Sequence, residues 1–189
     1  HRYQYPKKAY QTVNMPADPK LIPNVPEEST EVTVLRTELP GIVTLHQKAT
    51  LEGSSRDWSA FMKANDCCHM AVIERYGVEG NIAYGFLQNF GLREGAVASS
   101  VGHDAHNVIV AGHDEASMAL AVETIRGSHG GVVVVQNGTV EAFIPLPIAG
   151  LISDLRAPEV AKAASKVKAA WVKAGCTLPY MGFNLLPLS

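Results

Sequence analysis

The run Val132–Val135, with the Asn137-Gly138 pair that follows it, constrains the fold of this chain more than any other feature. Consecutive valines favour an extended strand, and Asn-Gly supplies the two positive-φ residues of a type I′ turn. The chain then returns as TVEAFIPL, which predicts a β-hairpin. Because a hairpin interrupts the strand–helix alternation of parallel sheets, we expect a mixed or mainly antiparallel sheet.

Further strand patterns occupy the middle and the first part of the chain. Between residues 69 and 112, short runs rich in β-branched and aromatic residues alternate with glycines, which favours strands joined by tight turns. Apolar and polar residues alternate over residues 31–35, and a second run at 42–45 follows a turn at Leu39-Pro40-Gly41. These two runs predict another pair of strands.

Three segments have the apolar spacing of helices that bury one face. The first carries Trp58 and is expected to begin at Ser54 or Ser55. The second begins at the N-cap Asp114, and the third has Pro158 in its first turn. Strands and helices in this order predict an α+β domain whose sheet is packed by about three helices.

The first 30 residues differ from the rest because prolines interrupt them throughout. Prolines at this density prevent both helix propagation and a central strand. We therefore expect residues 1–30 to form a Pro-rich arm or linker and residues 31–189 to form the domain. Since the chain begins with His1 instead of Met, we also expect it to be a piece of something longer.

Charge and composition exclude several classes of partner. The net charge is −2, whereas nucleic acids and anionic membranes select a dense cationic face, so we expect neither as a partner. The chain has no apolar run of about 18 residues and no apolar signal segment at its start. An odd number of cysteines, including the neighbours Cys67 and Cys68, argues against a disulfide framework. These features predict a cytoplasmic protein.

The candidate site is the segment VGHDAHNVIV, which gathers two imidazoles, a carboxylate and an amide at His103, His106, Asp104 and Asn107. Imidazole and carboxylate groups bind zinc, iron and manganese. The segment joins two predicted strands, and such connections often carry functional groups on a rigid sheet. The alternative is a polar turn in which Asp104 and Asn107 bond to the backbone and the histidines have no role. Spacing alone leaves both interpretations open.

Other polar residues near the strands have ordinary structural interpretations. We expect His69 to be a core histidine and Asp114 to cap its helix instead of binding a metal. Glu74 and Arg75, which stand close to Gly77, are expected to form a surface ion pair, and the alternative is that they bind a ligand.

Two long stretches of the chain resemble a known family, the C-terminal domain of bacterial and archaeal adenine deaminases in the amidohydrolase superfamily. The similarity is carried by HMAVIERYGVEGNIAYGFLQNFGLREGAVASSVGHDAHNVIVAG and, after it, by GGVVVVQNGTVEAFIPLPIAGLISD. It covers roughly residues 65–180. The resemblance implies a purine-salvage hydrolase that converts adenine to hypoxanthine and ammonia. Its divalent metals, commonly iron or manganese, are held in a (β/α)8 barrel.

This chain does not contain the barrel, because 189 residues are too few and no two of its seven histidines form the H-x-H of the superfamily. The resemblance therefore implies an accessory domain whose partners are the catalytic barrel domain of the same enzyme and adenine as substrate. It implies that the segment from His103 to Asn107 faces the catalytic mouth, with His103, Asp104 and His106 as metal ligands. Ala105 stands where the family usually has serine, and Gly102 where alanine is usual.

Three hypotheses follow. In the first, the chain is the accessory domain of an adenine deaminase, is inactive alone, and meets manganese or iron only in the complete enzyme. In the second, the same loop makes the chain a non-catalytic metal- or purine-binding module. In the third, the domain is purely structural. The sequence leaves the number of copies open, and a homo-oligomer is among the states that it allows.

Overall fold

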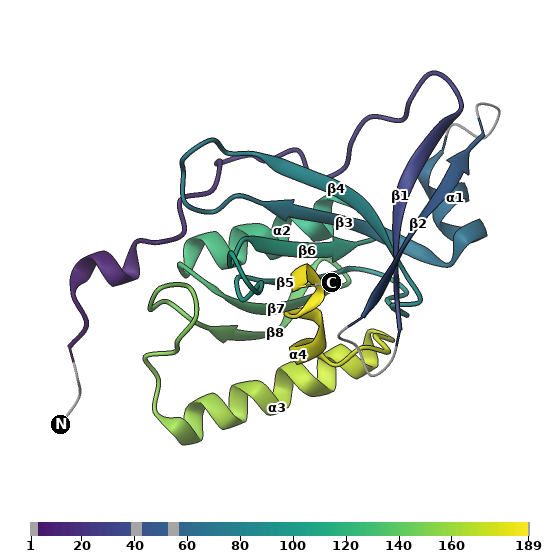
Figure 1. Cartoon of the computed structure of the whole chain (residues 1–189). Coiled ribbons are helices and arrows are strands. Elements are labelled where there is room, and N and C mark those ends of the chain that lie inside the picture. Colours follow the sequence, from purple (N-terminus) through teal and green to yellow (C-terminus); the bar gives the residue numbers. More distant parts are fainter. Residues whose placement is uncertain (1–3, 39–42, 53–56, 189) are drawn as a thin grey trace.

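The computed structural model describes residues 4–38, 43–52 and 57–188. Within these ranges eight strands form one sheet in the order β2-β1-β4-β3-β6-β5-β7-β8 (Figure 1). Neighbouring strands are antiparallel except for β1 and β4, which are parallel. The mixed, mainly antiparallel sheet of the predicted α+β fold is thus confirmed. The strands are β1 Thr30–Thr37, β2 Thr44–Leu51, β3 Cys67–Ile73, β4 Ile82–Gln88, β5 Ala96–Ser99, β6 Val108–Gly112, β7 Gly131–Gln136 and β8 Thr139–Pro145.

The three predicted helices are present, and a shorter one follows them. The described ranges contain α1 Trp58–Asn65, α2 Glu115–Gly127, α3 Ala157–Lys173 and α4 Tyr180–Phe183, with 3-10 turns at Lys7–Tyr10 and Leu186–Leu188. None of the helices in this part of the chain has the length and apolar composition needed to cross a membrane.

The predicted start of the first helix is wrong. Asp57 caps α1, because its carboxylate accepts a hydrogen bond from the Ser59 N–H at 2.9 Å. Ser54 and Ser55 themselves lie outside the described residues, as does the turn expected at Leu39-Pro40-Gly41.

The hairpin predicted from the valine run is confirmed as β7 and β8. Asn137 and Gly138 have φ values of 51° and 68°, as a type I′ turn requires. Every residue of β7 is buried. Val132 and Val134 belong to one hydrophobic cluster, and Val133 and Val135 to another. The run shows no polar alternation because both faces of this strand are covered.

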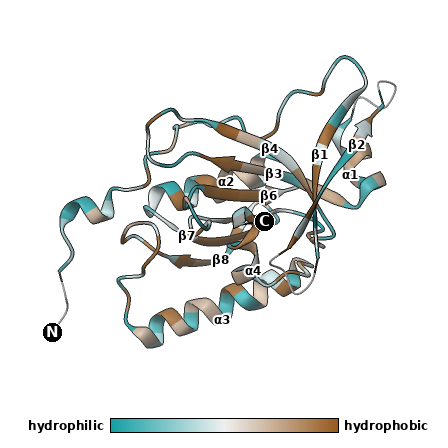
Figure 2. Cartoon of the chain, in the orientation of Figure 1, coloured by the Kyte–Doolittle hydropathy of each residue, from teal (hydrophilic) through white to brown (hydrophobic). Residues whose placement is uncertain are grey.

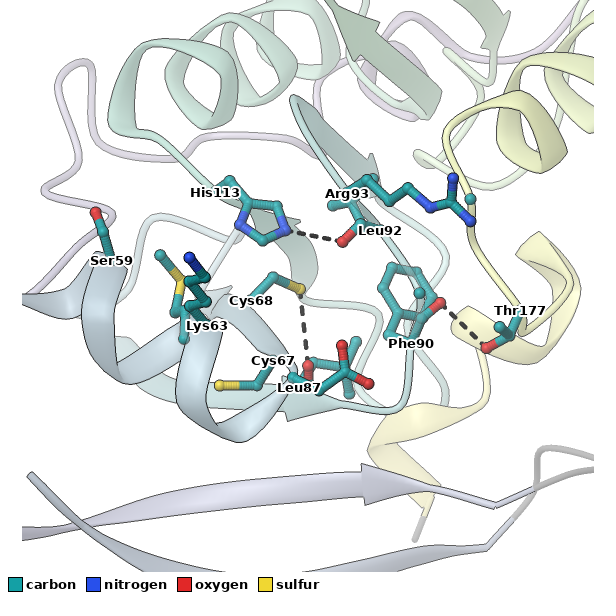
Figure 3. A pocket seen from close by; sticks show the side chains of 14 residues that line it. Ser59, Lys63, Cys67, Cys68, Leu87, Phe90, Leu92, Arg93, His113 and Thr177 are labelled. Carbon is teal, nitrogen blue, oxygen red and sulfur yellow. Dashed lines mark hydrogen bonds between the residues drawn. The ribbon is translucent and has the colours of Figure 1, made fainter.

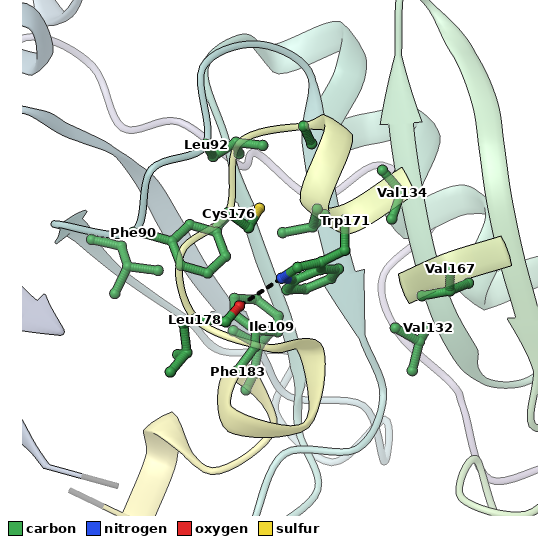
Figure 4. Close-up of a cluster of buried hydrophobic side chains, with 14 of the residues drawn as sticks. Phe90, Leu92, Ile109, Val132, Val134, Val167, Trp171, Cys176, Leu178 and Phe183 are labelled. Carbon is green, nitrogen blue, oxygen red and sulfur yellow. Dashed lines mark hydrogen bonds between the residues drawn. The ribbon is translucent and has the colours of Figure 1, made fainter. Parts of the chain in front are cut away.

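Helix α2 packs on one face of β7, and helix α3 packs on the other. The α2 side chains Met118 and Ile125 pack in the cluster of Val133 and Val135. On the other face, Trp171 of α3 packs with Phe183 and the segment between them (Figure 4). The Trp171 indole N–H donates to the Leu178 carbonyl at 2.7 Å, which satisfies its one buried donor.

The segment before β1 lies against the domain. Val13, Met15 and Leu21 are buried in the cluster under α2. The Trp58 indole N–H donates to the Pro23 carbonyl at 2.9 Å, which fixes the segment near α1. The strands β6 and β7 are largely hydrophobic (Figure 2), in line with their central place in the sheet. The division of the chain into an arm of residues 1–30 and a domain of residues 31–189 stays a prediction.

Candidate functional site

The loop between β5 and β6 holds the four predicted site residues at one end of the sheet. His103 and Asp104 are exposed, and His106 and Asn107 are half-buried. The imidazole rings of His103 and His106 lie beside each other, with their centroids 5.1 Å apart. The structure therefore brings the two imidazoles together in an open position instead of enclosing them in the core.

Backbone hydrogen bonds fix the shape of this loop. The His106 N–H donates to the Gly102 carbonyl at 2.5 Å, and His106 has a left-handed φ of 55°. The His103 N–H donates to the Asn184 carbonyl at 3.0 Å, which ties the loop to the residue after α4. A Cβ at Gly102 would lie 2.7 Å from the Asn107 carbonyl oxygen, so this loop shape is suited to glycine at that position.

A further support comes from the connection between β3 and β4. The Tyr76 hydroxyl donates to the Ala105 carbonyl at 2.6 Å. The Arg75 guanidinium lies 5.0 Å from the centroid of the Tyr76 ring and donates through Nη2 to the Ala149 carbonyl at 3.0 Å. Arg75 is only 2% exposed. The predicted surface ion pair between Glu74 and Arg75 is therefore wrong, because Arg75 points into the protein.

Glu74 instead organises the β3–β4 connection. Its carboxylate accepts hydrogen bonds from four backbone N–H groups between Tyr76 and Gly80, at 2.5 to 3.4 Å. Desolvation pushes the pKa of Glu74 upward, but these backbone hydrogen bonds together outweigh it and hold the pKa below its ordinary value. The ionised carboxylate thus fixes the turn that places Tyr76 against the site loop.

Several buried polar atoms around the loop have no hydrogen-bond partner among the described residues. They include two atoms on the loop, the ring nitrogen Nδ1 of His106 and the acceptor Oδ1 of Asn107, and two donors on Arg75, Nε and Nη1. Oδ1 of Asn184, whose backbone carbonyl holds His103, is also without a partner. Buried polar groups are normally paired, so this cluster marks a place where water or another molecule is needed to complete the hydrogen bonding.

The charge state of His106 follows from the same surroundings. Burial is the main cause that lowers the pKa of His106, and the nearby His103 and Arg75 lower it further, while Asp104 opposes them. The His106 imidazole is therefore neutral at neutral pH, with one nitrogen available as an acceptor.

The described residues do not assemble a metal centre. No three His, Cys, Asp or Glu side chains in these ranges are grouped so that they hold a metal ion. The loop contributes two adjacent imidazoles, which is fewer than the three protein ligands of a typical catalytic zinc site. The role of His103, Asp104 and His106 as metal ligands stays a prediction.

His69 and Asp114 have the structural roles that the sequence predicted. His69 is 2% exposed and packs against the Trp58 and Phe86 rings, with centroids 5.9 and 4.9 Å away. Asp114 caps α2 by accepting a hydrogen bond from the Ser117 N–H at 2.8 Å. The sequence reasoning weighed Arg75 as a ligand-binding residue but preferred a surface ion pair, and so did not place it in the site. The available signal was an arginine only two residues after the end of β3, a strand that is buried along almost its whole length.

Comparisons with known proteins identify the family of this chain. The family model described as adenine deaminase C-terminal domain matches residues 41–189. The chain is 52% identical over 189 residues to adenine deaminase 2 of Bradyrhizobium sp. (strain ORS 278), covering all of this chain and 31% of that protein. It is 41% identical over 169 residues to the adenine deaminase of Moorella thermoacetica, covering 87% of this chain and 28% of the relative.

An archaeal relative shows the same relation. The adenine deaminase of Methanococcoides burtonii is 39% identical over 181 residues, which cover 94% of this chain and 31% of that protein. The chain thus spans less than a third of the length of each of these relatives. The residues that the family model matches include the His103–Asn107 loop, the strands β3 and β6 in the middle of the sheet, and the β7–β8 hairpin. This chain belongs to the adenine deaminase C-terminal domain family.

Proposed function

We propose that this chain forms the C-terminal part of an adenine deaminase and presents its His103–Asn107 loop to an active site built on another domain of the same enzyme. The observation that carries the proposal is the pair of adjacent imidazoles on a loop that is open to solvent yet fixed by hydrogen bonds. The names of the relatives supply the reaction, and the 31% coverage of the Bradyrhizobium protein leaves room for a separate catalytic domain.

In the proposed reaction, water replaces the exocyclic amino group of adenine, and the products are hypoxanthine and ammonia. A divalent metal such as manganese or iron, when bound in the catalytic domain, supplies a water molecule of lowered pKa. The described residues form no metal centre by themselves, and the proposed part of this chain is to bind and orient. Exposed His103 and Asp104 reach outward to the catalytic domain, while neutral His106 and Asn107 offer acceptor atoms to N–H groups.

The experiment uses the complete enzyme that contains this segment. We expect His106→Ala and His103→Ala each to lower kcat by about tenfold or more, because they remove groups that face the reaction. His46→Ala is the matched control, since His46 is an exposed histidine on the edge strand β2. Thermal unfolding of each variant checks that the fold is retained. Unchanged turnover in both loop variants contradicts the proposal.

The isolated chain provides an independent arm of this test. Purified protein is incubated with adenine and either manganese or iron, and hypoxanthine is measured by its absorbance spectrum. We expect none, because no metal centre is formed by the described residues. Hypoxanthine production by the chain alone contradicts an accessory role.

A second function is favoured by one observation, the unpartnered buried atoms of Arg75, His106 and Asn107. In this alternative the chain is a non-catalytic module that binds a metal or a purine by itself. Calorimetry of the isolated chain with manganese, zinc and adenine separates the two functions. Tight binding by the chain alone supports the module, whereas binding only in the complete enzyme supports a partial active site.

A further inference from the structure

A cavity of about 610 Å³ lies at the end of the sheet opposite the His103–Asn107 loop (Figure 3). The strand β6 begins directly after Asn107 and ends directly before His113, which lines the cavity. The cavity is formed by α1, the beginning of β3, the end of β4 with the residues after it, and the segment that follows α3. It is therefore a separate place on the domain, and nothing in the proposed function uses it.

The floor of this cavity is apolar. Its apolar lining residues are Met62, Cys68, Leu87, Phe90 and Leu92. All five are also members of the hydrophobic clusters, so little of each is exposed. The Phe90 ring is held in place because it stacks on Phe183, with a centroid distance of 5.5 Å. A cavity of this volume with a fixed apolar floor is typical of sites for small organic molecules.

The rim carries more positive than negative charge. Lys63 and Arg93 line the cavity, and neither forms an ion pair with any of the described residues. Asp66 is the carboxylate among the lining residues. Figure 3 shows Lys63 and His113 on one side of the cavity and Arg93 on the other, near Thr177. An occupant placed between them meets a cation from α1 and another from the β4–β5 connection.

His113 adds a directed polar group to this rim. Its Nε2 lies 2.8 Å from the Leu92 carbonyl oxygen, and because a carbonyl only accepts, Nε2 carries the hydrogen. This bond fixes the ring and leaves Nδ1 for an occupant.

We propose that this cavity binds a small phosphate monoester whose phosphate lies beside Lys63 and His113 and whose organic part rests on the apolar floor. A phosphate monoester carries a charge of about −1.5 to −2 at neutral pH, which matches two cations that form no ion pair among the described residues. An inorganic ion leaves the floor uncovered, and a neutral ring leaves the cations unpaired. The combination of both features therefore selects an organic anion.

The test is a titration of the 189-residue chain with adenosine monophosphate, followed by NMR of backbone amides and histidine rings. Adenosine, which lacks the phosphate, and inorganic phosphate, which lacks the organic part, are titrated in parallel. We expect adenosine monophosphate to bind at least about tenfold more tightly than either, with the largest shifts at Lys63, Leu92 and His113.

Charge variants locate the phosphate. We expect Lys63→Glu to weaken binding of adenosine monophosphate by about tenfold and Lys63→Gln by less, since reversal repels the ligand. Lys168→Glu is the matched control, because Lys168 is an exposed lysine on α3 that does not line the cavity, and the change should alter affinity by less than about twofold. Near-ultraviolet circular dichroism confirms that each variant is folded.

Three results overturn the proposal. Adenosine binding as tightly as adenosine monophosphate removes the role of the cations. If Lys168→Glu weakens the binding of adenosine monophosphate as much as Lys63→Glu does, the effect comes from the overall charge of the protein and not from the cavity. Shifts confined to His103 and His106 place the ligand at the other end of the sheet. None of these outcomes depends on deamination, so the proposed function stands or fails separately.

Discussion

The Tyr76 hydroxyl lies 2.6 Å from the Ala105 carbonyl oxygen and joins the β3–β4 connection to the loop that carries His103 and His106. Tyr76 is itself held from behind, because the Glu74 carboxylate accepts a hydrogen bond from its N–H and the Arg75 guanidinium lies over its ring. The position of the site loop thus depends on a turn that is distant from it in the sequence.

Replacing Tyr76 by phenylalanine tests this dependence. We expect Tyr76→Phe to lower the free energy of unfolding by no more than about 1 kcal/mol, because one partly exposed hydrogen bond is lost. Amide hydrogen exchange of His103 and His106 should become faster in this variant. Tyr84→Phe is the control, since it removes a similar hydrogen bond to the Lys20 carbonyl in another region. Equal exchange rates in both variants contradict the expectation.

Gly150 is expected to be intolerant of a side chain because of Arg75. Its φ is +69°, and a Cβ there would collide with Nη1 of Arg75. Gly150→Ala should therefore lower the free energy of unfolding by about 2–4 kcal/mol. Gly138→Ala is a matched control, because Gly138 has a φ of +68° and nothing within 4 Å. Chemical denaturation of both variants measures the difference, and similar losses would mean that Arg75 is free to move.

The buried His69 predicts a loss of stability in mild acid. Burial, and to a smaller degree the nearby His113, lowers the pKa of His69 to about 4. Protonation between pH 6.5 and 4 therefore favours the unfolded chain, where the histidine has its ordinary pKa. This group should remove up to about 3 kcal/mol of stability as the pH falls through that window. Urea unfolding at several pH values measures the slope. His69→Gln should flatten it, and an unchanged slope assigns the effect to other groups.

The cap of α2 gives a simple prediction for stability. Asp114→Ala removes the side-chain acceptor of the Ser117 N–H and should lower the free energy of unfolding by about 1 kcal/mol. Asp114→Asn retains an acceptor oxygen and should restore most of the loss. Thermal unfolding of the two variants distinguishes the cap from a general effect of charge, which Asn would not repair.

Local patterns in the sequence predicted the local elements well. Asn137-Gly138 specifies its turn because both residues readily adopt positive φ, and Asp114 specifies a helix start because its side chain accepts a backbone hydrogen bond. Both effects act within a few residues. The parallel pairing of β1 with β4 was not predicted, since the pairing joins residues about fifty positions apart and no local pattern encodes it.

The same limit applies to the candidate site. His103 and His106 were found because they are close in the sequence, and the structure keeps their rings 5.1 Å apart. Arg75 was misjudged because its neighbour Glu74 suggested an ion pair, whereas its actual partner is the Ala149 carbonyl. Burial of Arg75 results from segments that come together only in the folded chain. The cavity beside His113 was missed for the same reason, because four separate segments form it.

Strand β6 determines the separation between Asn107 and His113, the residues that flank it. Its five residues are all buried, and it pairs with β3 on one side and β5 on the other. Adding or deleting one residue within it would exchange the side chains of its two faces, moving Val110 out of its own hydrophobic cluster. Insertions are therefore tolerated only beyond its ends. The spacing between Asn107 and His113, six residue steps of about 3.3 Å or about 20 Å in all, is therefore a fixed dimension of the domain.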